Sequence, residues 1–477
     1  MNKLELPLVI NGQFAKSDSI KMLTSFDGEP FATLYGATNA QIRTVRRAIA
    51  KQVAELRTIP IEDVVKLIKS SMKYYFINES DATDLAILTG APRRFISESI
   101  EFMKSWALEC EQYLQAVFGK VDYQYQAVCD SNKDFAYRIY QSKGPIVALL
   151  PQNGYAGEAL FVALNSLLSR SPIIIKPSSN QAASLPVLQL INALRMAAQD
   201  LSHSNFARLV NSIHVLNVFQ NDTSSNGPTI NDLFASGDQL IVFGSQDTVR
   251  ALSSVNGQTI HFSNIIQFGT GLSVSMVFDN CDLNLAVKEN AVAVSEDRGN
   301  QCHSTNVIYV QNDIADNFIA LLKKELNTIE IGNPCDHQTL TGKIHHASLE
   351  QIDTHYKRLF GAKASTSDVN SWKSPICIEV NLDDPIEEIS APVVAIKRFN
   401  EISCVLNQFR KDLKRNGLNR NLSTSVFTTN EAFAKEIAFS MPSRNVKRNK
   451  GTGRLNLMLE HDGKYLIKEL LKKIVLE

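Results

Sequence analysis

One cysteine stands in a setting that suits a nucleophile. Cys302 lies within residues 298–310, a polar glycine-containing loop that follows a predicted helix and leads into a predicted strand. Such a loop can expose a thiol beside backbone N–H donors. The adjacent His303 could activate this thiol, but neighbouring residues commonly point apart, so we interpret His303 as a bystander. A single cysteine in a cytosolic protein is more often a small buried apolar residue, and Cys302 therefore needs support from other residues.

Asn153 and Lys176 follow or end short apolar strands predicted over residues 145–150 and 171–176. Ligands of open α/β sheets bind at the carboxyl ends of such strands. The Asn153 carboxamide could donate to a developing oxyanion, a contact worth about 2.7–4 kcal/mol when it is preorganised. The Lys176 ammonium could bind a ribose hydroxyl or a phosphate. The plainer interpretations are an asparagine in a turn and a solvated lysine at a strand end.

Gly244 and Ser245 follow another such strand, over residues 239–243, and open a predicted helix, so their N–H groups could face a pyrophosphate. An isolated Gly-Ser pair is weak support for that role. The strands are not followed by a GxGxxG or Walker motif. This argues against a conventional Rossmann phosphate loop and against a P-loop.

The elements that must position these residues alternate between strand and helix. A first series of two strand–helix pairs and two further strands runs over residues 145–150, 159–168, 171–176, 183–197, 214–219 and 239–243. Apolar strands separated by helices are typical of a buried parallel sheet. A second series begins with two strand–helix pairs over residues 274–278, 283–294, 307–310 and 314–326. Strands over 376–380, 392–396 and 423–427 and a helix over 402–413 complete it. We therefore predict an α/β fold with two doubly wound sheets and a boundary near residue 270.

Further segments frame these two series. Thr38 and Asn39 can cap a helix in a mainly helical N-terminal region. Residues 121–128 and 135–140 are strand-like and flank a turn cluster, which predicts a β-hairpin that could serve as an oligomerisation arm. Residues 465–475 are predicted to form a last apolar helix.

The composition narrows the functional classes. The chain has 477 residues, of which 44% are hydrophobic, and its 49 basic and 49 acidic residues give no net charge. Without a global basic field, nucleic acid is not an expected partner. No apolar run is long enough for a transmembrane helix, and the N-terminal apolar stretch, broken by Glu5 and Pro7, is too short for a signal peptide. The seven cysteines show no CxxC or Cys/His pairing, so we expect a cytoplasmic protein without a metal site.

Five short motifs occur in a recognisable order. They are Pro-x-Asn, Lys-Pro-Ser and Phe-Gly-Ser after strands, then Gly-x-x-Cys and Glu-x-x-x-Pro. This order resembles the aldehyde dehydrogenase superfamily over nearly the whole chain, from Val9-Ile-Asn-Gly-Gln-Phe14 onward. The resemblance implies an aldehyde dehydrogenase-like α/β fold with two doubly wound parallel-sheet domains and a β oligomerisation arm. It assigns a nucleotide-binding domain to residues 1–120 and 144–270, a catalytic domain to 271–454, and an arm and tail to 121–143 and 455–477.

The same resemblance implies roles for the site residues. Cys302 becomes the thiolate that forms a thiohemiacetal or thioester, and Asn153 with the Cys302 N–H becomes the oxyanion site. The residues implied to bind an NADH or NADPH cofactor are Lys176, Ser178, Ser179, Gly244, Ser245 and Glu388, the last at the nicotinamide ribose.

Two departures from the family pattern bear on the reaction. Gln267 replaces the glutamate of the hydrolytic members, so the carboxylate that would activate the deacylating water is missing. Ser179 stands where NAD-preferring members commonly have glutamate, so a 2′-phosphate would not be repelled and NADPH is permitted. In both departures the chain resembles one branch of the superfamily, the fatty acyl-CoA (acyl-protein) reductases of the bacterial luminescence type.

These observations support three hypotheses. The first is an NAD(P)-dependent oxidoreductase that reduces an acyl thioester to an aldehyde through acyl-Cys302, with an acyl-activating protein as a partner that could charge the cysteine. The second is an aldehyde dehydrogenase that oxidises an aldehyde to an acid. The third is a catalytically silent member, favoured by eroded motifs such as Pro151-Gln-Asn153. The predicted hairpin and the apolar C-terminal tail further indicate a homodimer or homotetramer, because such arms pair across two-fold axes in the family.

Overall fold

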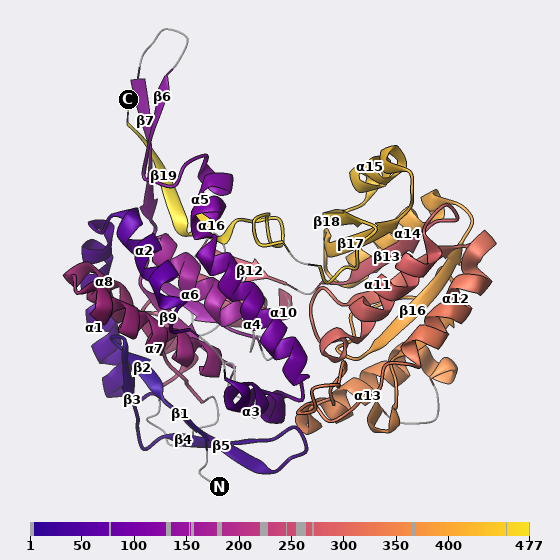
Figure 1. Ribbon diagram of the computed structural model, residues 1–477, viewed down its shortest axis with the longest axis horizontal. Coiled ribbons are helices and arrows are strands. Elements are labelled where there is room, and N and C mark those ends of the chain that lie inside the picture. Colours follow the sequence, from indigo (N-terminus) through magenta and orange to yellow (C-terminus); the bar gives the residue numbers. More distant parts are fainter. Residues whose placement is uncertain are drawn as a thin grey trace.

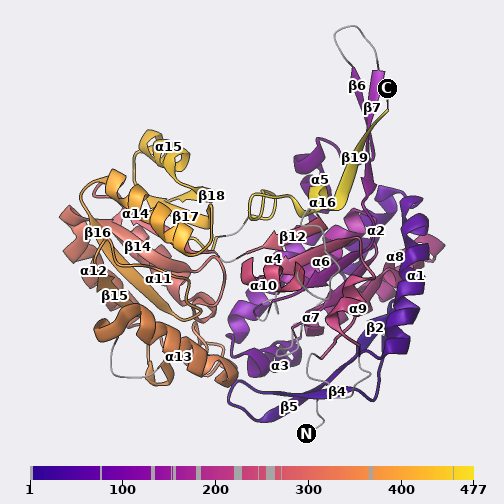
Figure 2. The same ribbon diagram turned by 180° about the vertical axis from the view of Figure 1, so that it is seen from behind.

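A computed structural model gives the architecture of the protein (Figure 1). It describes residues 4–75, 78–129, 135–151, 153, 157–178, 184–219, 228–244, 246–253, 264–269, 271–364, 369–454 and 456–476. Two large sheets, each flanked by helices, stand side by side, and a narrow β-structure projects from the body, as both views show (Figures 1 and 2).

The first sheet has the strand order β12-β11-β8-β9-β10-β2-β3. Its strands are β2 (Leu8–Ile10), β3 (Gln13–Ala15), β8 (Ile146–Leu149), β9 (Ile173–Lys176), β10 (Ile213–Val215), β11 (Gln239–Phe243) and β12 (Ile265–Phe268). The five strands from β12 to β10 are parallel, whereas β2 and β3 add an antiparallel edge. The carboxyl ends of the parallel strands therefore meet at one edge, where the predicted ligand-binding residues lie.

The side chains of each strand alternate between the two faces of this sheet, and helices cover both faces. Ile173 and Ile175 pack into the core that contains α6 (Glu158–Leu168) and α7 (Ser184–Leu201). Ile174 points to the opposite core, which contains α1 (Asn39–Arg57). Because successive side chains of a strand point to opposite faces, a run of three isoleucines serves two helical layers. Short helices α8 (Ser204–Asn211), α9 (Ile230–Phe234) and α10 (Gln246–Ser253) complete this part.

The second sheet has the order β15-β16-β14-β13-β17-β18 and is parallel throughout. Its strands are β13 (Ser273–Val277), β14 (Thr305–Gln311), β15 (Ile376–Val380), β16 (Val393–Phe399), β17 (Asn421–Phe427) and β18 (Ser443–Arg448). The helices around it are α11 (Leu283–Ser295), α12 (Asn312–Leu326), α13 (His346–Phe360), α14 (Ile402–Arg415) and α15 (Glu431–Ser440). Together with the first sheet, this arrangement confirms the predicted α/β fold.

The N-terminal region is helical with a small sheet. Its helices after α1 are α2 (Ile61–Ser71), α3 (Glu79–Thr89), α4 (Arg93–Leu108) and α5 (Cys110–Phe118), and β1 (Leu4–Leu6), β5 (Pro30–Tyr35) and β4 (Ile20–Thr24) pair in that order. The predicted cap of α1 is present, since Thr38 and Gln41 form a reciprocal capping box. Among the described residues, no helix combines the length and apolar character needed to cross a membrane.

The projecting structure is a three-stranded antiparallel sheet with the order β19-β7-β6. Strands β6 (Tyr125–Cys129) and β7 (Phe135–Ser142) form the predicted hairpin, whose turn lies outside the described residues. The predicted helix over 465–475 is wrong. Only α16 (Leu466–Leu470) is helical, and β19 (Leu471–Leu476) pairs with β7. This pairing satisfies the N–H and C=O groups of the β7 edge, which local periodicity cannot foresee.

Candidate active site

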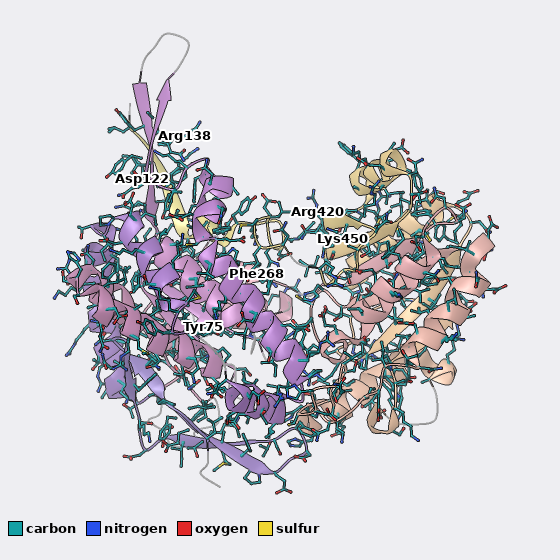
Figure 3. The ribbon with its side chains drawn as sticks, in the orientation of Figure 1. Tyr75, Asp122, Arg138, Phe268, Arg420 and Lys450 are labelled. Atoms are coloured by element: carbon teal, nitrogen blue, oxygen red, sulfur yellow. The ribbon has the colours of Figure 1, made fainter. Side chains whose placement is uncertain are left out.

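A cavity of about 480 Å³ lies between the two sheets and reaches Cys302. Four of the residues predicted for the site line this cavity: Asn153, Gly244, Cys302 and Glu388. Its other walls come from helix α4, the start of α6, the strand ends of the first sheet and the segment after β18. Phe268, which Figure 3 labels between the two sheets, is one of the aromatic residues of this wall.

The chain takes a strained turn just before Cys302. Asp297 and Arg298 have positive φ angles of 45° and 63°, and Gly299 follows with 67°. Left-handed backbone is costly for residues with a side chain, so other contacts must hold the turn in place. Gly299 is required here, because a Cβ atom would lie 2.2 Å from the Ala391 carbonyl oxygen. This strain lies at the point where the nucleophile loop enters the cavity.

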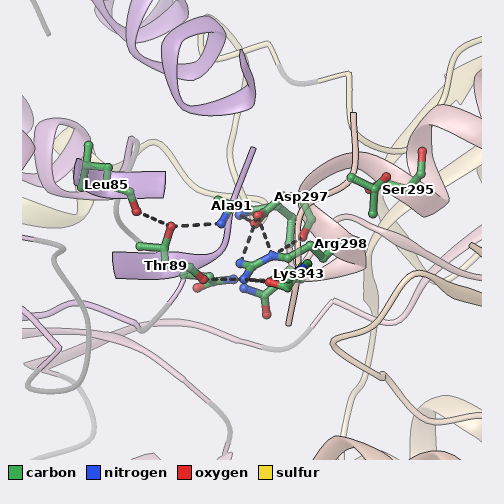
Figure 4. A network of polar contacts seen from close by, with 11 residues as sticks. Leu85, Thr89, Ala91, Ser295, Asp297, Arg298 and Lys343 are labelled. Carbon is green, nitrogen blue, oxygen red and sulfur yellow. Dashed lines mark hydrogen bonds and ion pairs between the residues drawn. The ribbon is translucent and has the colours of Figure 1, made fainter. Parts of the chain in front are cut away.

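The buried guanidinium of Arg298 supplies these contacts (Figure 4). It donates to the Thr89 carbonyl oxygen at 2.6 Å and to the Lys343 carbonyl oxygen at 3.2 Å, and it pairs with the Asp297 carboxylate at 3.1 Å. The same carboxylate accepts a 2.5 Å bond from the Gln301 carboxamide. The network thus ties the residue before Cys302 to the α3–α4 turn and to the segment before α13.

Asn153 reaches the Cys302 loop from the other sheet. Its carboxamide nitrogen donates a 2.6 Å hydrogen bond to the Asn300 carbonyl oxygen. Gly271 packs against the same loop so closely that a Cβ atom there would lie 1.5 Å from the Cys302 carbonyl oxygen. The carboxyl end of β8 and the start of β13 therefore position the loop from two sides. The oxyanion role of Asn153 stays a prediction.

The environment of Cys302 holds the thiol in its neutral form. Burial raises the pKa of this thiol well above its ordinary value, and the carboxyl groups of Glu388, Glu158 and Asp462 raise it further. Burial lowers the pKa of the neighbouring His303 to about 3, so this imidazole is uncharged near neutral pH. Lys447, on β18, is a nearby cation whose pKa burial lowers to about 8. Lys447 was missed by the sequence reasoning.

The predicted cofactor residues are divided between the cavity and the sheet edge. Lys176 is the last residue of β9, and its ammonium donates to the Pro177 carbonyl oxygen at 3.2 Å. Burial, with a smaller effect of Lys21, lowers the pKa of Lys176 to about 8. Ser178 follows at the same edge and is half-buried. Ser179 and Ser245 lie outside the described residues.

Glu388 connects the main cavity to a second one of about 250 Å³, which lies along α13, since it lines both. Its carboxylate accepts a 2.9 Å hydrogen bond from the Gly271 N–H. Burial raises the pKa of Glu388 to about 7, partly offset by the N–H groups of Gly271 and Leu272. A dinucleotide fits these groups, because Lys176 offers a cation at the strand edge and Glu388 offers a hydroxyl acceptor beside Cys302.

The Gln267 side chain serves as a hydrogen-bond donor and cannot act as a base. Its carboxamide nitrogen donates a 2.9 Å hydrogen bond to the Gly244 carbonyl oxygen, which joins the carboxyl ends of β11 and β12.

Two half-buried glutamates that the sequence reasoning missed line the cavity. Glu158 begins α6 and is the only charged residue of that apolar helix, and Glu296 lies six positions before Cys302. Burial raises the pKa of each to about 7. The available sequence signal was the lone carboxylate in Glu158-Ala-Leu-Phe-Val-Ala-Leu164, but only the fold shows where it points.

Comparison with known proteins identifies a family that the chain matches. Residues 14–463 match the family model described as the aldehyde dehydrogenase family. Aldehyde dehydrogenase [NAD(P)+] 1 of Saccharomyces cerevisiae is 23% identical over 72% of this chain and 65% of its own length. The NADP/NAD-dependent aldehyde dehydrogenase PuuC of Escherichia coli is 22% identical over 83% of this chain and 79% of its own length. The chain's match thus spans less than two thirds of the yeast protein.

Solved structures share the fold. An E. coli NADP-dependent enzyme superposes with a TM-score of 0.80 at 16% identity, over 99% of this chain and 98% of its own. The glyceraldehyde-3-phosphate dehydrogenase GapN of Methanocaldococcus jannaschii, solved with NADP, gives 0.78 at 17% identity, over 96% and 100%. The family match over residues 14–463, on a fold of the same architecture, shows that the chain belongs to the aldehyde dehydrogenase family.

Proposed function

We propose that this protein oxidises aldehydes to carboxylic acids with NAD(P)⁺ and water. The observation that carries the proposal is the shared cavity, which brings together the Cys302 thiol, the Asn153 carboxamide and the Glu158 carboxyl group. A nucleophile, an oxyanion donor and a base are the groups that acyl chemistry of this kind requires. The named relatives described above as aldehyde dehydrogenases support the same reaction.

The covalent steps begin at sulfur. The Cys302 sulfur bonds to the aldehyde carbon as the thiol proton passes to solvent water, and the Asn153 carboxamide and the Cys302 N–H stabilise the oxygen that becomes negative. A bound NAD(P)⁺ would supply the acceptor for the hydride of the aldehyde carbon. The thioester that remains on Cys302 is cleaved by water, which releases the carboxylic acid and returns the thiol. One aldehyde, one NAD(P)⁺ and one water give one carboxylate, one NAD(P)H and two protons.

We assign the activation of this water to Glu158. Gln267 cannot accept a proton, and its carboxamide is bonded to Gly244. Glu158 lines the cavity, acts electrostatically on Cys302, and has a pKa of about 7, raised chiefly by burial. A general base works best when its pKa is near the operating pH. In this proposal Glu158 replaces the carboxylate that the family pattern places at position 267.

The cofactor would be held by the first sheet and by Glu388. We propose that Lys176 and Ser178, with Ser179 and Ser245, bind the adenosine and pyrophosphate portion, and that Glu388 binds the nicotinamide ribose. The corresponding units are residues 1–120 and 144–270 for nucleotide binding and 271–454 for catalysis. We further propose a cytoplasmic homodimer or homotetramer with its arm at 121–143 and tail at 455–477.

A second candidate is reduction of an acyl thioester to an aldehyde, as in the fatty acyl-CoA reductase branch. It is favoured by one observation, the substitution of Gln267 for the family glutamate. Here Cys302 takes the acyl group and releases the carrier thiol, and a hydride from NAD(P)H converts the acyl group to an aldehyde as Cys302 leaves. A third candidate, a catalytically silent member, is favoured by Gly299-Asn-Gln-Cys302 and Pro151-Gln-Asn153 in place of the usual family motifs.

Absorbance of the reduced nicotinamide separates the three candidates. Wild type and Cys302→Ala are compared with aldehydes plus NAD⁺ or NADP⁺, and with acyl-CoA thioesters plus NADH or NADPH. We expect Cys302-dependent formation of NAD(P)H from aldehydes without an added thiol. Consumption of NAD(P)H that requires a thioester would replace this proposal with the reductive one. Absence of turnover in both directions would indicate the silent member.

A further inference from the structure

Carboxyl groups outnumber cations along the substrate cavity, and burial raises the pKa of three of them, Glu158, Glu296 and Glu388, to about 7. Of the described residues that line the cavity, five carry carboxyl groups and one carries a cation, Arg454. The carboxyl groups come from separate parts of the chain: Glu98, Glu158, Glu296, Glu388 and Asp462. The two imidazoles of the wall, His303 and His461, do not offset this charge, because burial lowers their pKa values to about 3 and about 4.

Glu296 has no ion-pair or hydrogen-bond partner among the described residues. Arg454 lies near it but pairs with the Glu289 carboxylate at 3.4 Å. The space beside Glu296 is kept free by Gly453, where a Cβ atom would lie 3.0 Å from a Glu296 carboxylate oxygen. Burial without a hydrogen-bonded counter-ion raises the pKa of Glu296 to about 7, so a cationic group bound in the cavity would favour its ionised form.

Helix α4 adds the second part of the binding surface. Glu98 and Phe102 are one helical turn apart on α4, and both line the cavity together with Phe95. Glu98 is 59% exposed and pairs with Arg94 at 2.7 Å, which places it at the outer part of the wall. The Glu98 charge acts on Glu296. Aromatic faces beside carboxylates are the surroundings that bind ammonium groups.

From this geometry we propose that the substrates are aldehydes that carry a positive charge, a protonated amine or a quaternary ammonium, which Glu296 and Glu98 bind while the aldehyde carbon meets Cys302. The inference rests on the proposed function and names its substrate class. The acidic surface also disfavours coenzyme A thioesters, whose carrier has several phosphate groups, because like charges repel across a desolvated wall. Gly271 binds Glu388 and Arg444 binds the more buried Asp462, whereas the pair of Glu98 with Arg94 is exposed to solvent, where such a pair is weak and can yield to a ligand.

The first test compares aldehydes that differ in charge. 3-Aminopropanal and butanal have nearly the same shape, and succinate semialdehyde provides a negative charge. We expect kcat/KM for 3-aminopropanal to exceed that for butanal by about tenfold or more, the worth of a charge-assisted contact. In Glu296→Gln and in Glu98→Gln the ratio should fall towards one. Glu101→Gln, on the exposed side of α4, is the matched control and should keep the ratio.

The second test needs no turnover. Cys302 is modified with trimethylammonioethyl methanethiosulfonate, which is cationic, or with sulfonatoethyl methanethiosulfonate, which is anionic, and mass spectrometry follows the labelled cysteine. We expect the cationic reagent to react about tenfold faster than the anionic one relative to their rates with a free thiol, and Glu296→Gln to reduce that preference. Cys302→Ala identifies reaction at the other cysteines.

The outcomes separate this inference from the function beneath it. Oxidation of butanal or succinate semialdehyde as fast as 3-aminopropanal would overturn the cationic preference and leave aldehyde oxidation in place. Absence of turnover with every aldehyde, together with preferential labelling by the cationic reagent, would overturn the oxidation and support the cation-binding cavity. Equal labelling rates for the two reagents would overturn the cation-binding cavity.

Discussion

The Gln267 carboxamide donates a 2.9 Å hydrogen bond to the carbonyl oxygen of Gly244. This bond ties the ends of two neighbouring strands and fixes a side chain that cannot act as a base. Gly244 itself lines the cavity, so the bond places the substituted position beside the reaction space. The carboxyl group that we propose as the base in this cavity is that of Glu158, at the start of α6.

Replacing Glu158 with glutamine should separate hydride transfer from hydrolysis. The variant keeps the shape of the side chain but cannot accept a proton, so acyl-Cys302 should accumulate. We expect a rapid burst of NAD(P)H that approaches one equivalent per site, followed by steady turnover lowered by about 10²–10⁴-fold. Stopped-flow absorbance and intact-protein mass spectrometry measure both. A variant that loses the burst as well would show that Glu158 is needed before hydrolysis.

Adding Gln267→Glu to Glu158→Gln should restore part of the hydrolysis. A carboxylate at position 267 cannot donate to the Gly244 carbonyl oxygen and is repelled by it, so it should turn towards the cavity that Gly244 lines. We expect steady-state turnover of the double variant to rise about tenfold above that of Glu158→Gln. Gln267→Asn in the same background is the control and should give no gain. A double variant as slow as the single one would contradict this exchange of roles.

The rate of aldehyde oxidation should fall at low pH with an apparent pKa near 7. Burial raises the pKa of Glu158 from its ordinary value of 4.5 to about 7. The base acts when it is ionised, so activity is present above this pKa and is lost as the pH falls through it, by about tenfold per pH unit at the limit. The measurement is steady-state kcat against pH in wild type and Glu158→Gln. The variant should lose this limb, and an unchanged profile would assign it to another group.

The fold could be predicted from the sequence because the apolar pattern of the strands indicates which of them are buried in a sheet. Three consecutive isoleucines, Ile173 to Ile175, indicate a strand buried on both faces, and both faces of the first sheet are covered. By contrast, Ser443–Arg448 forms the edge strand β18 with three basic residues. Edge strands often carry such charges, and a pattern without an apolar run gave no local signal. The tail over 471–476 became a strand because it meets the β7 edge.

For the site, motif order located Cys302 and Asn153 in one cavity but did not show its charge. Glu158 and Glu296 are ordinary glutamates in the sequence, one at a helix start and one before a loop. Their significance depends on α4 and the segment after β18 closing over them, which are contacts between residues far apart in the chain. A single sequence does not specify such contacts.

Replacing Arg298 with alanine should destabilise the protein strongly. The Asp297 carboxylate is fully buried, and the Arg298 guanidinium is its counter-ion. Removing one partner of a buried pair typically costs about 3–5 kcal/mol. We expect a loss of this size in urea unfolding, while Lys435→Ala, which breaks the exposed pair with Glu431, should change stability by less than about 1 kcal/mol. Similar values for the two variants would show that the Arg298 network does not hold the loop.

Gly271→Ala should displace the nucleophile. A Cβ atom at this position would lie 1.5 Å from the Cys302 carbonyl oxygen, so one of the two backbones must move. A shift of about 1 Å in a reacting group can cost about 10²-fold in rate, and we expect kcat/KM to fall by at least this factor. Gly119→Ala, at a left-handed position with open space, is the control for backbone strain and should retain activity. Full activity of Gly271→Ala would contradict the tight packing of this loop.

Truncation after Leu470 should reveal the role of the projecting sheet. Strand β19 pairs with β7 along six residues and leaves Ile474, Val475 and Leu476 at least 40% exposed. Three apolar side chains on an exposed sheet are expected at an interface between copies, because covering them removes apolar surface from water.

Light scattering should give a dimer or tetramer for the full chain and a smaller species for the truncated chain. The truncated chain should keep the thermal unfolding transition of the first sheet and its helix α6. The double variant Lys472→Glu, Lys473→Glu keeps the strand and its apolar side chains, so it is the control for a change of charge alone. A monomeric full chain would overturn the oligomer, since the arm would then serve only to complete its own three-stranded sheet.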